Sequence, residues 1–369
     1  MCIRDRAAPD LRRADRQRRA PLTPAVTGGP TLAARAEALL AQHWWQPQPS
    51  ALAQLLRPWS WLYRALAGWQ RRRQRPRALP VPVIVVGNFI VGGAGKTPTV
   101  IALVQALSAA GWHPGVISRG YGRRDAGARE VAARDPVVDV GDEPLLIRRR
   151  TAVPVWVGRD RVAAARALCA RHPEVDVIVS DDGLQHHALP RRAEWVVFDE
   201  RGAGNGLLLP AGPLREPLPK SLPARTRIVY TGGVASTGLP GELVRRSLGL
   251  AWPLAAWAAG SRQEAPPLAH LRGRPLLAAA GLAAPEKFFA MLEQVGLTIT
   301  RLPLPDHHDY TTLPWPADTA EVVTTEKDAV KIDPAHIGAT QVWVVPLDLA
   351  LPASLVGELM SWLPAPTPP

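Results

Sequence analysis

Glycines, a lysine and a threonine follow a short apolar stretch at one place in this chain. Residues 81–97 read VPVIVVGNFIVGGAGKT. A buried strand that ends in a glycine-rich turn exposes successive backbone N–H groups to a phosphate, and the helix that follows presents its positive N-terminus. Lys96 supplies a cation for the phosphates and Thr97 a hydroxyl for Mg²⁺. The segment therefore predicts a phosphate-binding loop for a nucleoside triphosphate.

This loop departs by one residue from the usual pattern GxxxxGK[ST], because Ile90 stands where the first glycine is expected. The alternative is a plain strand–turn–helix junction whose glycines serve only tight packing. Gly-Lys-Thr at this spacing behind an apolar strand favours the phosphate loop. The residues expected around the phosphates are Gly92, Gly93, Ala94, Gly95, Lys96 and Thr97.

Two aspartates follow a second short apolar stretch. Residues 175–180 read VDVIVS and are followed by Asp181, Asp182 and a glycine. Carboxylates at the carboxyl end of a strand beside the phosphate loop are the oxygen ligands that Mg²⁺ needs. The sequence predicts that Thr97 and these aspartates hold the metal, and it leaves open which aspartate is the direct ligand.

Four further polar segments could carry chemistry, and each has a simpler interpretation. Asp142 and Glu143 precede an apolar helix, where they could act in a reaction or only cap the helix. His186 follows the two aspartates and could equally be a polar loop residue. Residues 306–310, DHHDY, resemble an acid–base or metal cluster but also an ordinary surface loop, and residues 325–328, TEKD, gather charges at the end of a predicted strand.

Short apolar strands alternate with helical segments after residue 81. This rhythm predicts an α/β fold of the P-loop NTPase type, a mainly parallel sheet with helices on both faces and its site at the carboxyl ends of the strands. A passage dense in proline and glycine, residues 209–219, is the expected boundary. We expect a phosphate-loop domain over 81–218 and a second, smaller α/β domain over 219–369 that closes a cleft.

Composition limits the remaining possibilities. The chain has 369 residues, 47% of them hydrophobic, and two cysteines, so it is a globular protein of a reducing compartment rather than a disulfide scaffold. Its net charge is +12, but residues 1–80 contain 15 of the 44 basic residues and only 4 of the 32 acidic ones. The excess of basic residues therefore lies in the N-terminal segment. A nucleic-acid-binding domain would spread this charge over its own surface, so the distribution argues against nucleic acid as the partner.

The N-terminal segment is rich in tryptophan, leucine and arginine. Over residues 33–80, aromatic and leucine residues alternate with arginines and end in the basic run 71–77. This pattern predicts an amphipathic membrane-associated helix at an anionic membrane surface, because the stretch is too interrupted by arginine and proline for a transmembrane span. The alternative is a helix packed on the protein's own core. Residues 1–32 lack apolar periodicity and are expected to be disordered or a non-native extension.

Several motifs together resemble one family, the tetraacyldisaccharide 4'-kinases of Gram-negative lipid A synthesis. The resemblance covers about residues 33–345 and implies transfer of the γ-phosphate of ATP to the 4'-hydroxyl of tetraacyldisaccharide 1-phosphate, which gives lipid IVA. It implies ATP and Mg²⁺ as cofactors, a place on the cytoplasmic face of the inner membrane and no obligate protein partner. The motifs, in order, are VGNFIVGGAGKTPTV, SRGYGR, VGDEPLLI, VGRDRVAAAR, SDDGLQHH, GNGLLLPAGPLREP, GLAAPEKFF, PDHHDYT and TEKDAVK.

The resemblance also implies roles for single residues. Asp142 would be the general base, and His307 from the second domain would form a dyad with it, with Lys96 assisting catalysis at the phosphates. Positions that match those lining the family's site are Tyr121, Glu143, Gln185, His186 and Arg215.

Two other classes of function stay open from the residues alone. The chain could be a P-loop GTPase-like metallochaperone or switch, which would hydrolyse nucleotide without a lipid. It could also be a membrane or nucleic-acid docking protein with an inactive nucleotide fold, against which Lys96, Thr97 and the paired aspartates argue.

Overall fold

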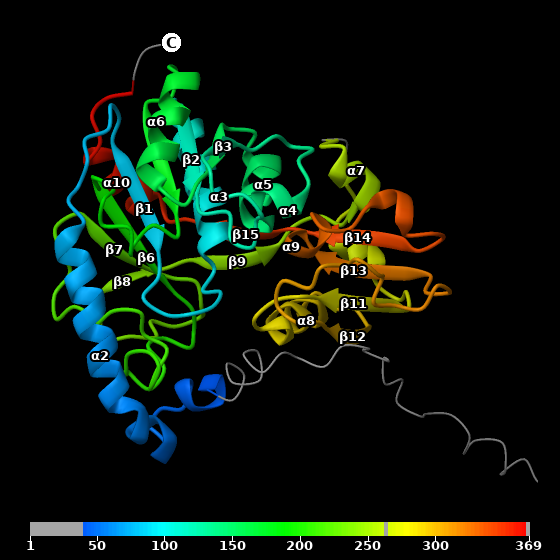
Figure 1. Cartoon of the computed structure of the whole chain (residues 1–369). Helices are drawn as coiled ribbons and strands as arrows, with labels where there is room; N and C mark the ends of the chain where they lie inside the picture. Colours follow the sequence, from blue (N-terminus) through cyan, green and yellow to red (C-terminus); the bar gives the residue numbers. More distant parts are fainter. Residues whose placement is uncertain (1–39, 262–264, 367–369) are drawn as a thin grey trace, which may run out of the picture.

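The computed structural model describes residues 40–261 and 265–366, so the expectation about residues 1–32 lies outside the described residues. Two α/β units lie on either side of a short two-stranded connection, and a long helix runs along the edge of the larger unit (Figure 1). The expected α/β class, with mainly parallel sheets, is confirmed.

The larger unit is built on an eight-stranded sheet of order β3-β4-β2-β5-β1-β6-β7-β8, in which only β3 is antiparallel to its neighbour. β1 and β5 are buried along their whole length, which explains why both appear in the sequence as continuous apolar runs. The strands are β1 (Val83–Gly87), β2 (Pro114–Ser118), β3 (Arg129–Glu130), β4 (Val155–Val157), β5 (Val177–Asp181), β6 (Ala193–Phe198), β7 (Thr226–Tyr230) and β8 (Gly241–Leu243).

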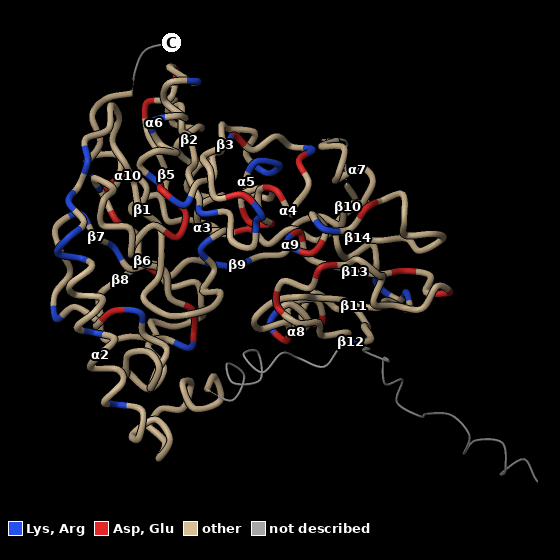
Figure 2. The backbone as a smooth tube through the Cα atoms, in the orientation of Figure 1, with Lys and Arg blue, Asp and Glu red and all other residues tan. Residues whose placement is uncertain are grey.

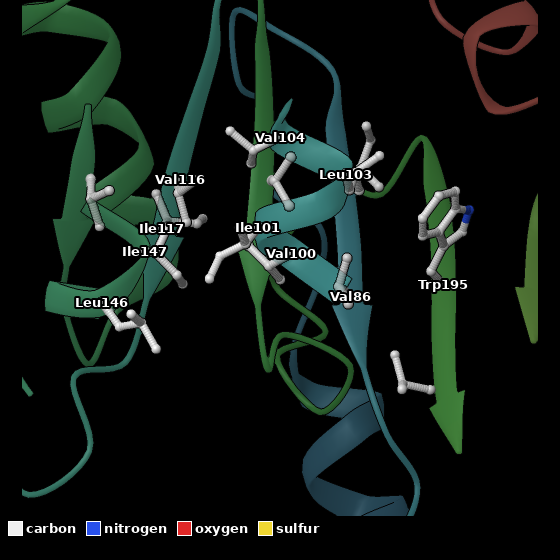
Figure 3. Close-up of a cluster of buried hydrophobic side chains, with 14 of the residues drawn as sticks. Val86, Val100, Ile101, Leu103, Val104, Val116, Ile117, Leu146, Ile147 and Trp195 are labelled. Carbon is white, nitrogen blue, oxygen red and sulfur yellow. The ribbon is translucent and has the colours of Figure 1, made fainter. Parts of the chain in front are cut away.

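Helices cover both faces of this sheet. The connections through α3 and α5 step along the sheet in one direction and the connection through α6 steps back, and right-handed crossovers of opposite direction lie on opposite faces. Val100 and Val104 of α3 share one buried cluster with Val86 of β1 and Ile117 of β2 (Figure 3). The helices are α3 (Lys96–Ala109), α4 (Val137–Val140), α5 (Asp142–Thr151), α6 (Arg161–Arg171) and α10 (Ala353–Ser361).

The smaller unit has a five-stranded sheet of order β10-β14-β13-β11-β12, parallel except for β10. Its strands are β10 (Trp252–Pro253), β11 (Leu276–Ala280), β12 (Ile299–Pro303), β13 (Glu321–Thr325) and β14 (Gln341–Val345). Its helices are α7 (Leu254–Ala258), α8 (Pro285–Gln294), α9 (Glu326–Ala329) and the 3₁₀ turns η1 (Leu268–Leu271) and η2 (Pro334–His336).

The chain leaves the larger unit through β9 (Arg245–Leu248) and returns through β15 (Leu347–Ala350), and these two strands pair antiparallel. β7 and β8 belong to the larger sheet, and α10 packs on that unit through the buried Leu355 and Leu359. The expected division after residue 218 therefore does not coincide with a boundary between sheets. The Pro/Gly-rich passage is instead a loop of the larger unit, where Leu214 bridges to Ile90.

The long helix at the edge of the larger unit is α2 (Ala51–Arg73). Ser50 caps its N-terminus by accepting a hydrogen bond from the Ala53 N–H, and Pro58 lies within the helix. No acidic residue occurs between positions 40 and 80, and basic positions recur along α2 and the chain after it (Figure 2). No helix among the described residues is long and apolar enough to cross a bilayer.

Candidate functional site

The phosphate loop joins β1 to α3 and needs glycine for its shape. Gly92 and Gly95 have φ values of 83° and 86°, a region that favours residues without a Cβ. A Cβ on Gly95 would also lie 3.0 Å from the Thr231 Oγ1 atom, which donates a hydrogen bond to the Ala94 carbonyl. The turn is therefore held by Thr231, the residue that follows β7, as well as by its own sequence.

Lys96 is buried at the start of α3, and its Nζ lies 3.4 Å from Asn88 Oδ1 and 3.8 Å from Asp182 Oδ1. Asn88 also donates to the Gly92 carbonyl, so one side chain braces both the lysine and the loop. Sequence reasoning missed Asn88. The signal that could have identified it is its position, because Asn88 is a polar residue that directly follows the apolar strand and lies inside the loop.

The two aspartates end β5, the neighbour of β1, in which Val86 pairs with Asp181. Asp181 is fully buried and accepts a hydrogen bond from Ser118 at Oδ2, whereas its Oδ1 has no hydrogen-bond partner among the described residues. Burial, with the nearby charges of Glu143 and Asp182, raises the pKa of Asp181 to about 7. A buried carboxylate oxygen without a partner is unfavourable unless a cation or a proton faces it.

Asp182 differs from its neighbour because cations surround it. Arg215 Nη1 lies 3.3 Å and 3.2 Å from its two carboxylate oxygens, and Arg161 donates to its backbone carbonyl. Burial opposes ionisation of Asp182, but the charges of Lys96 and Arg215 outweigh it and lower the pKa of the carboxyl group. Asp182 is therefore an anion that holds the cations of Lys96 and Arg215 close together.

These residues fit Mg²⁺ bound together with a nucleotide. The described residues contain no cluster of three or more His, Cys, Asp or Glu side chains that could hold a metal alone. Mg²⁺ usually takes one or two carboxylates and fills its other positions with phosphate oxygens and water. The free Oδ1 of Asp181 and the Thr97 hydroxyl at the start of α3 match that donor set.

A histidine of the smaller unit contacts an aspartate of the larger one. His307 Nδ1 lies 2.8 Å from Asp142 Oδ2, although 165 residues separate them. Asp142 begins α5 after Gly141, whose φ is 91° and whose added Cβ would lie 3.1 Å from the Gly120 Cα. The adjacent His308 does not share this contact, because its ring packs edge-on against Tyr310 with centroids 4.8 Å apart.

Proton affinities in this pair are set by its surroundings. The hydrogen bond with Asp142 raises the pKa of His307, and this effect outweighs burial and the charge of Lys327. Burial opposes ionisation of Asp142, but the hydrogen bond from His307 and the charge of Lys327 lower its pKa below the usual value. The pair is thus an ionised carboxylate hydrogen-bonded to an imidazole whose pKa lies above its usual value.

Four more side chains lie around the pair. The Tyr121 ring is 67% exposed and lies 5.7 Å from the His307 ring, between centroids. Lys327 of α9 lies 3.1 Å from Asp306, 3.4 Å from His307 Nε2 and 3.9 Å from Glu143. Burial disfavours the charge of Lys327, but Glu143 and Asp306 outweigh it and raise the lysine's pKa. Sequence reasoning noted this lysine only as part of a charge cluster.

Gln185 and His186 take different positions from each other. Gln185 Oε1 lies 3.4 Å from Arg215 Nη1, and its amide donates to Glu216, so it belongs to the surroundings of Asp182. His186 lies 3.9 Å from Asp160, the cap of α6, and its Nε2 has no hydrogen-bond partner among the described residues. Burial and the charge of Arg161 lower the pKa of His186 to about 4, so it is neutral at physiological pH.

A cavity of about 200 Å³ lies between the phosphate loop and the smaller unit. Its loop side is formed by residues 93–98, and its far side by apolar residues of the smaller unit, among them Leu282, Phe288 and Met291. Lys287 of α8 reaches across its edge, with Nζ 2.9 Å from Asp199 and 2.9 Å from Glu200. Sequence reasoning missed these three charged residues, because nothing in the local pattern pairs α8 with the end of β6.

Comparison with known proteins finds one family that matches most of the chain. The family described as tetraacyldisaccharide-1-P 4'-kinase matches residues 52–363. The tetraacyldisaccharide 4'-kinase of Leptothrix cholodnii is 52% identical over 335 residues, covering 88% of this chain and 95% of the relative. That of Methylibium petroleiphilum is 53% identical over 324 residues, covering 85% and 90%.

A solved structure extends the likeness to the fold. The crystal structure of LpxK from Aquifex aeolicus in complex with ATP superimposes with a TM-score of 0.68 at 27% sequence identity, covering 84% of this chain and 99% of that one. The expected family is confirmed by the sequence match, the relatives and this structure. This chain belongs to the tetraacyldisaccharide 4'-kinase family.

Proposed function

We propose that Asp142 and His307 accept the proton of the acceptor hydroxyl while the larger unit holds the nucleotide, at a membrane surface that α2 contacts. The reaction of this family is transfer of the γ-phosphate of ATP to the 4'-hydroxyl of tetraacyldisaccharide 1-phosphate. The observation that carries our assignment is the 2.8 Å contact between His307 Nδ1 and Asp142 Oδ2 across the two units.

A sugar hydroxyl is a poor nucleophile, so the reaction needs a base near the attacking oxygen and exact alignment of the phosphate. Asp142 suits the base because its lowered pKa keeps it ionised at neutral pH. His307, bonded to that carboxylate, orients it and can share the proton that Asp142 removes. The product lipid IVA then leaves with the proton held on the pair until it is released to water.

The phosphates would be held by the loop amides of residues 92–95 and by Lys96, with Arg215 as a second cation. Guanidinium is planar and permanently charged, which suits a phosphate clamp. Asp182 keeps Lys96 and Arg215 close together before any phosphate is present. Thr97, with Asp181 or Asp182, would hold Mg²⁺, which when bound neutralises charge on the phosphate oxygens.

Contacts between the units support a closed site during transfer. Besides the Asp142–His307 pair, Glu143 of the larger unit lies 3.9 Å from Lys327 of the smaller one. Exclusion of water strengthens these interactions and protects ATP from hydrolysis. Tyr121, Glu143 and Gln185 would line the acceptor side of this site, and His186 would contribute at most a neutral imidazole.

The outer face of α2 supports docking at an anionic membrane surface. The exposed large apolar side chains of this helix are Leu52, Leu55, Trp59, Trp61, Leu62, Leu66 and Trp69. Tryptophans with a basic flank, and no acidic residue from 40 to 80, are typical of helices that lie in a lipid interface. The lipid substrate resides in a membrane, so we place the chain on the cytoplasmic face of the inner membrane.

The test supplies purified protein with Mg²⁺, γ-labelled ATP and detergent-dispersed tetraacyldisaccharide 1-phosphate. We expect label in the lipid with the wild type and a large loss in Asp142→Asn. Hydrolysis of ATP without labelled lipid would instead support a P-loop switch. Membrane docking is tested separately by flotation with anionic phosphatidylglycerol vesicles, where Trp59→Ser together with Trp61→Ser should weaken binding and Gln70→Ala should not.

A further inference from the structure

The loop over residues 205–216 lies between α2 and the phosphate loop. On the phosphate-loop side, the Arg215 N–H donates to the Phe89 carbonyl at 2.7 Å, and the Val91 N–H donates to the Pro213 carbonyl at 3.0 Å. Phe89 and Val91 belong to the turn between β1 and Lys96. The backbone of the 205–216 loop is therefore paired with the first half of the phosphate loop.

The inner face of α2 holds the other side of the same loop. Ser60 is buried and donates from Oγ to the Leu208 carbonyl at 2.8 Å. The Tyr63 hydroxyl donates to the Arg215 carbonyl at 2.9 Å. The two peptide groups of Arg215 are thus fixed from opposite sides, the N–H by the phosphate loop and the carbonyl by α2.

The side chain of that same arginine enters the site. Arg215 Nη1 contacts both carboxylate oxygens of Asp182 and lies 3.4 Å from Gln185 Oε1. Arg215 thus connects the two: its carbonyl accepts the hydrogen bond from the Tyr63 hydroxyl, and its guanidinium contacts Asp182. Trp61 and Leu62, the two residues before Tyr63, have exposed side chains.

We propose that Tyr63 is a positioning residue, which transmits the seating of α2 on the 205–216 loop to the guanidinium of Arg215. The lipid-facing helix thereby sets the rate of phosphoryl transfer as well as the affinity for the membrane. This inference rests on the proposed function, because it assigns a control to the same site. It predicts that loss of one hydroxyl on α2 lowers kcat.

A second connection between α2 and the site is weaker. Arg71 lies 4.0 Å from Glu216, which accepts a hydrogen bond from Gln185, but the Arg71 side chain is 67% exposed. Solvent screening makes such a pair worth little. The hydrogen bond from the half-buried Tyr63 hydroxyl is therefore the contact whose loss should lower kcat. Replacement by phenylalanine removes this hydroxyl and keeps the aromatic ring.

The experiment measures γ-phosphate transfer to tetraacyldisaccharide 1-phosphate for wild type, Tyr63→Phe and Gln70→Ala, an exposed control on the same helix. We expect kcat of Tyr63→Phe to fall about three- to tenfold, the size of one lost hydrogen bond. The KM values for ATP and lipid, and flotation with phosphatidylglycerol vesicles, should stay within about twofold of wild type by the same reasoning. Gln70→Ala should match the wild type.

A double-mutant cycle with Arg215→Lys shows whether Tyr63 acts through the arginine. In the Arg215→Lys background, Tyr63→Phe should lose most of its effect, because two coupled residues are not additive. Unchanged kcat in Tyr63→Phe, additive losses in the cycle, or a rise in lipid KM alone would overturn the inference. Absence of labelled lipid with the wild type would instead refute the proposed function, so the two failures are distinguishable.

Discussion

Replacement of Asp142 by asparagine tests the base directly and leaves the geometry of the site nearly unchanged. Asparagine has the same shape, can still accept the Glu143 N–H that bonds Asp142 Oδ1 at 2.9 Å, and can still pair with His307. What it loses is the negative charge and the ability to take a proton. Asp142 is 5% exposed, so water cannot easily take over that role.

The size of the loss follows from what a positioned general base contributes. Such a base accelerates proton transfer by about 10²- to 10⁴-fold, which corresponds to roughly 3–5 kcal/mol of the barrier. We expect kcat of Asp142→Asn to fall by that factor. The KM for ATP should change little, because Asp142 does not line the cavity beside the phosphate loop.

The pH profile adds a second readout. The raised pKa of His307 means that the pair holds its proton until the pH rises above that value. Wild-type kcat should therefore fall as the pH drops through the raised pKa. In Asp142→Asn the hydrogen bond to a carboxylate is gone, so the pKa of His307 falls. The acid limb of the profile, the fall of kcat at low pH, should therefore move to lower pH.

The assay is transfer of labelled γ-phosphate across the range from acid to alkaline pH, with Asp139→Asn as the control. Asp139 is a partly exposed carboxylate three residues earlier, so its loss should leave kcat near the wild-type value. A fall of less than about fivefold in Asp142→Asn, well below the contribution of a general base, would refute the assignment. An acid limb unchanged by the substitution would refute the coupling to His307.

Three further outcomes follow from other contacts. Gly95→Ala should weaken ATP binding at least tenfold in a titration, because the residue has a φ of 86° and a Cβ there would lie 3.0 Å from a threonine hydroxyl. Arg150→Met should lower the free energy of unfolding in urea by about 3–5 kcal/mol, since it leaves Glu326 buried without its cation, and adding Glu326→Gln should recover most of that loss. Lys327→Met should move the acid limb of kcat to higher pH, because the lysine's charge lowers the pKa of His307.

The sequence was informative wherever the chemistry lay within one segment. The phosphate loop could be predicted from residues 81–97 because a strand, a turn and a helix start occur there in succession. The aspartates after β5 could be predicted because parallel strands bring their carboxyl ends to one edge, and β5 is the neighbour of β1. The apolar stretches that begin at residues 81 and 175 agree with β1 and β5 to within a few residues.

Contacts between the two units could not be predicted from such local patterns, because the residues that make them are far apart in the chain. The residues alone left open whether the 306–310 segment was a surface loop, and only the resemblance to the kinase family selected His307. Its choice over His308 depends on the backbone, since His307 has a φ of 59° and faces Asp142 while His308 packs on Tyr310. Lys287 of α8 gave no local signal because its partners follow β6, far away in the chain.

A second contact between the two units lies at the far end of the helix that Asp142 begins. α5 begins with Asp142 and carries Arg150 near its other end, where the guanidinium lies 2.5 Å from Glu326 and 2.5 Å from Asp348. Glu326 in turn begins α9 and directly precedes Lys327, which faces His307. A ten-residue helix is about 15 Å long, so Arg150 ties the two units together at the opposite end of α5 from Asp142. We therefore expect loss of the Arg150 ion pairs to weaken the Asp142–His307 contact as well as the fold.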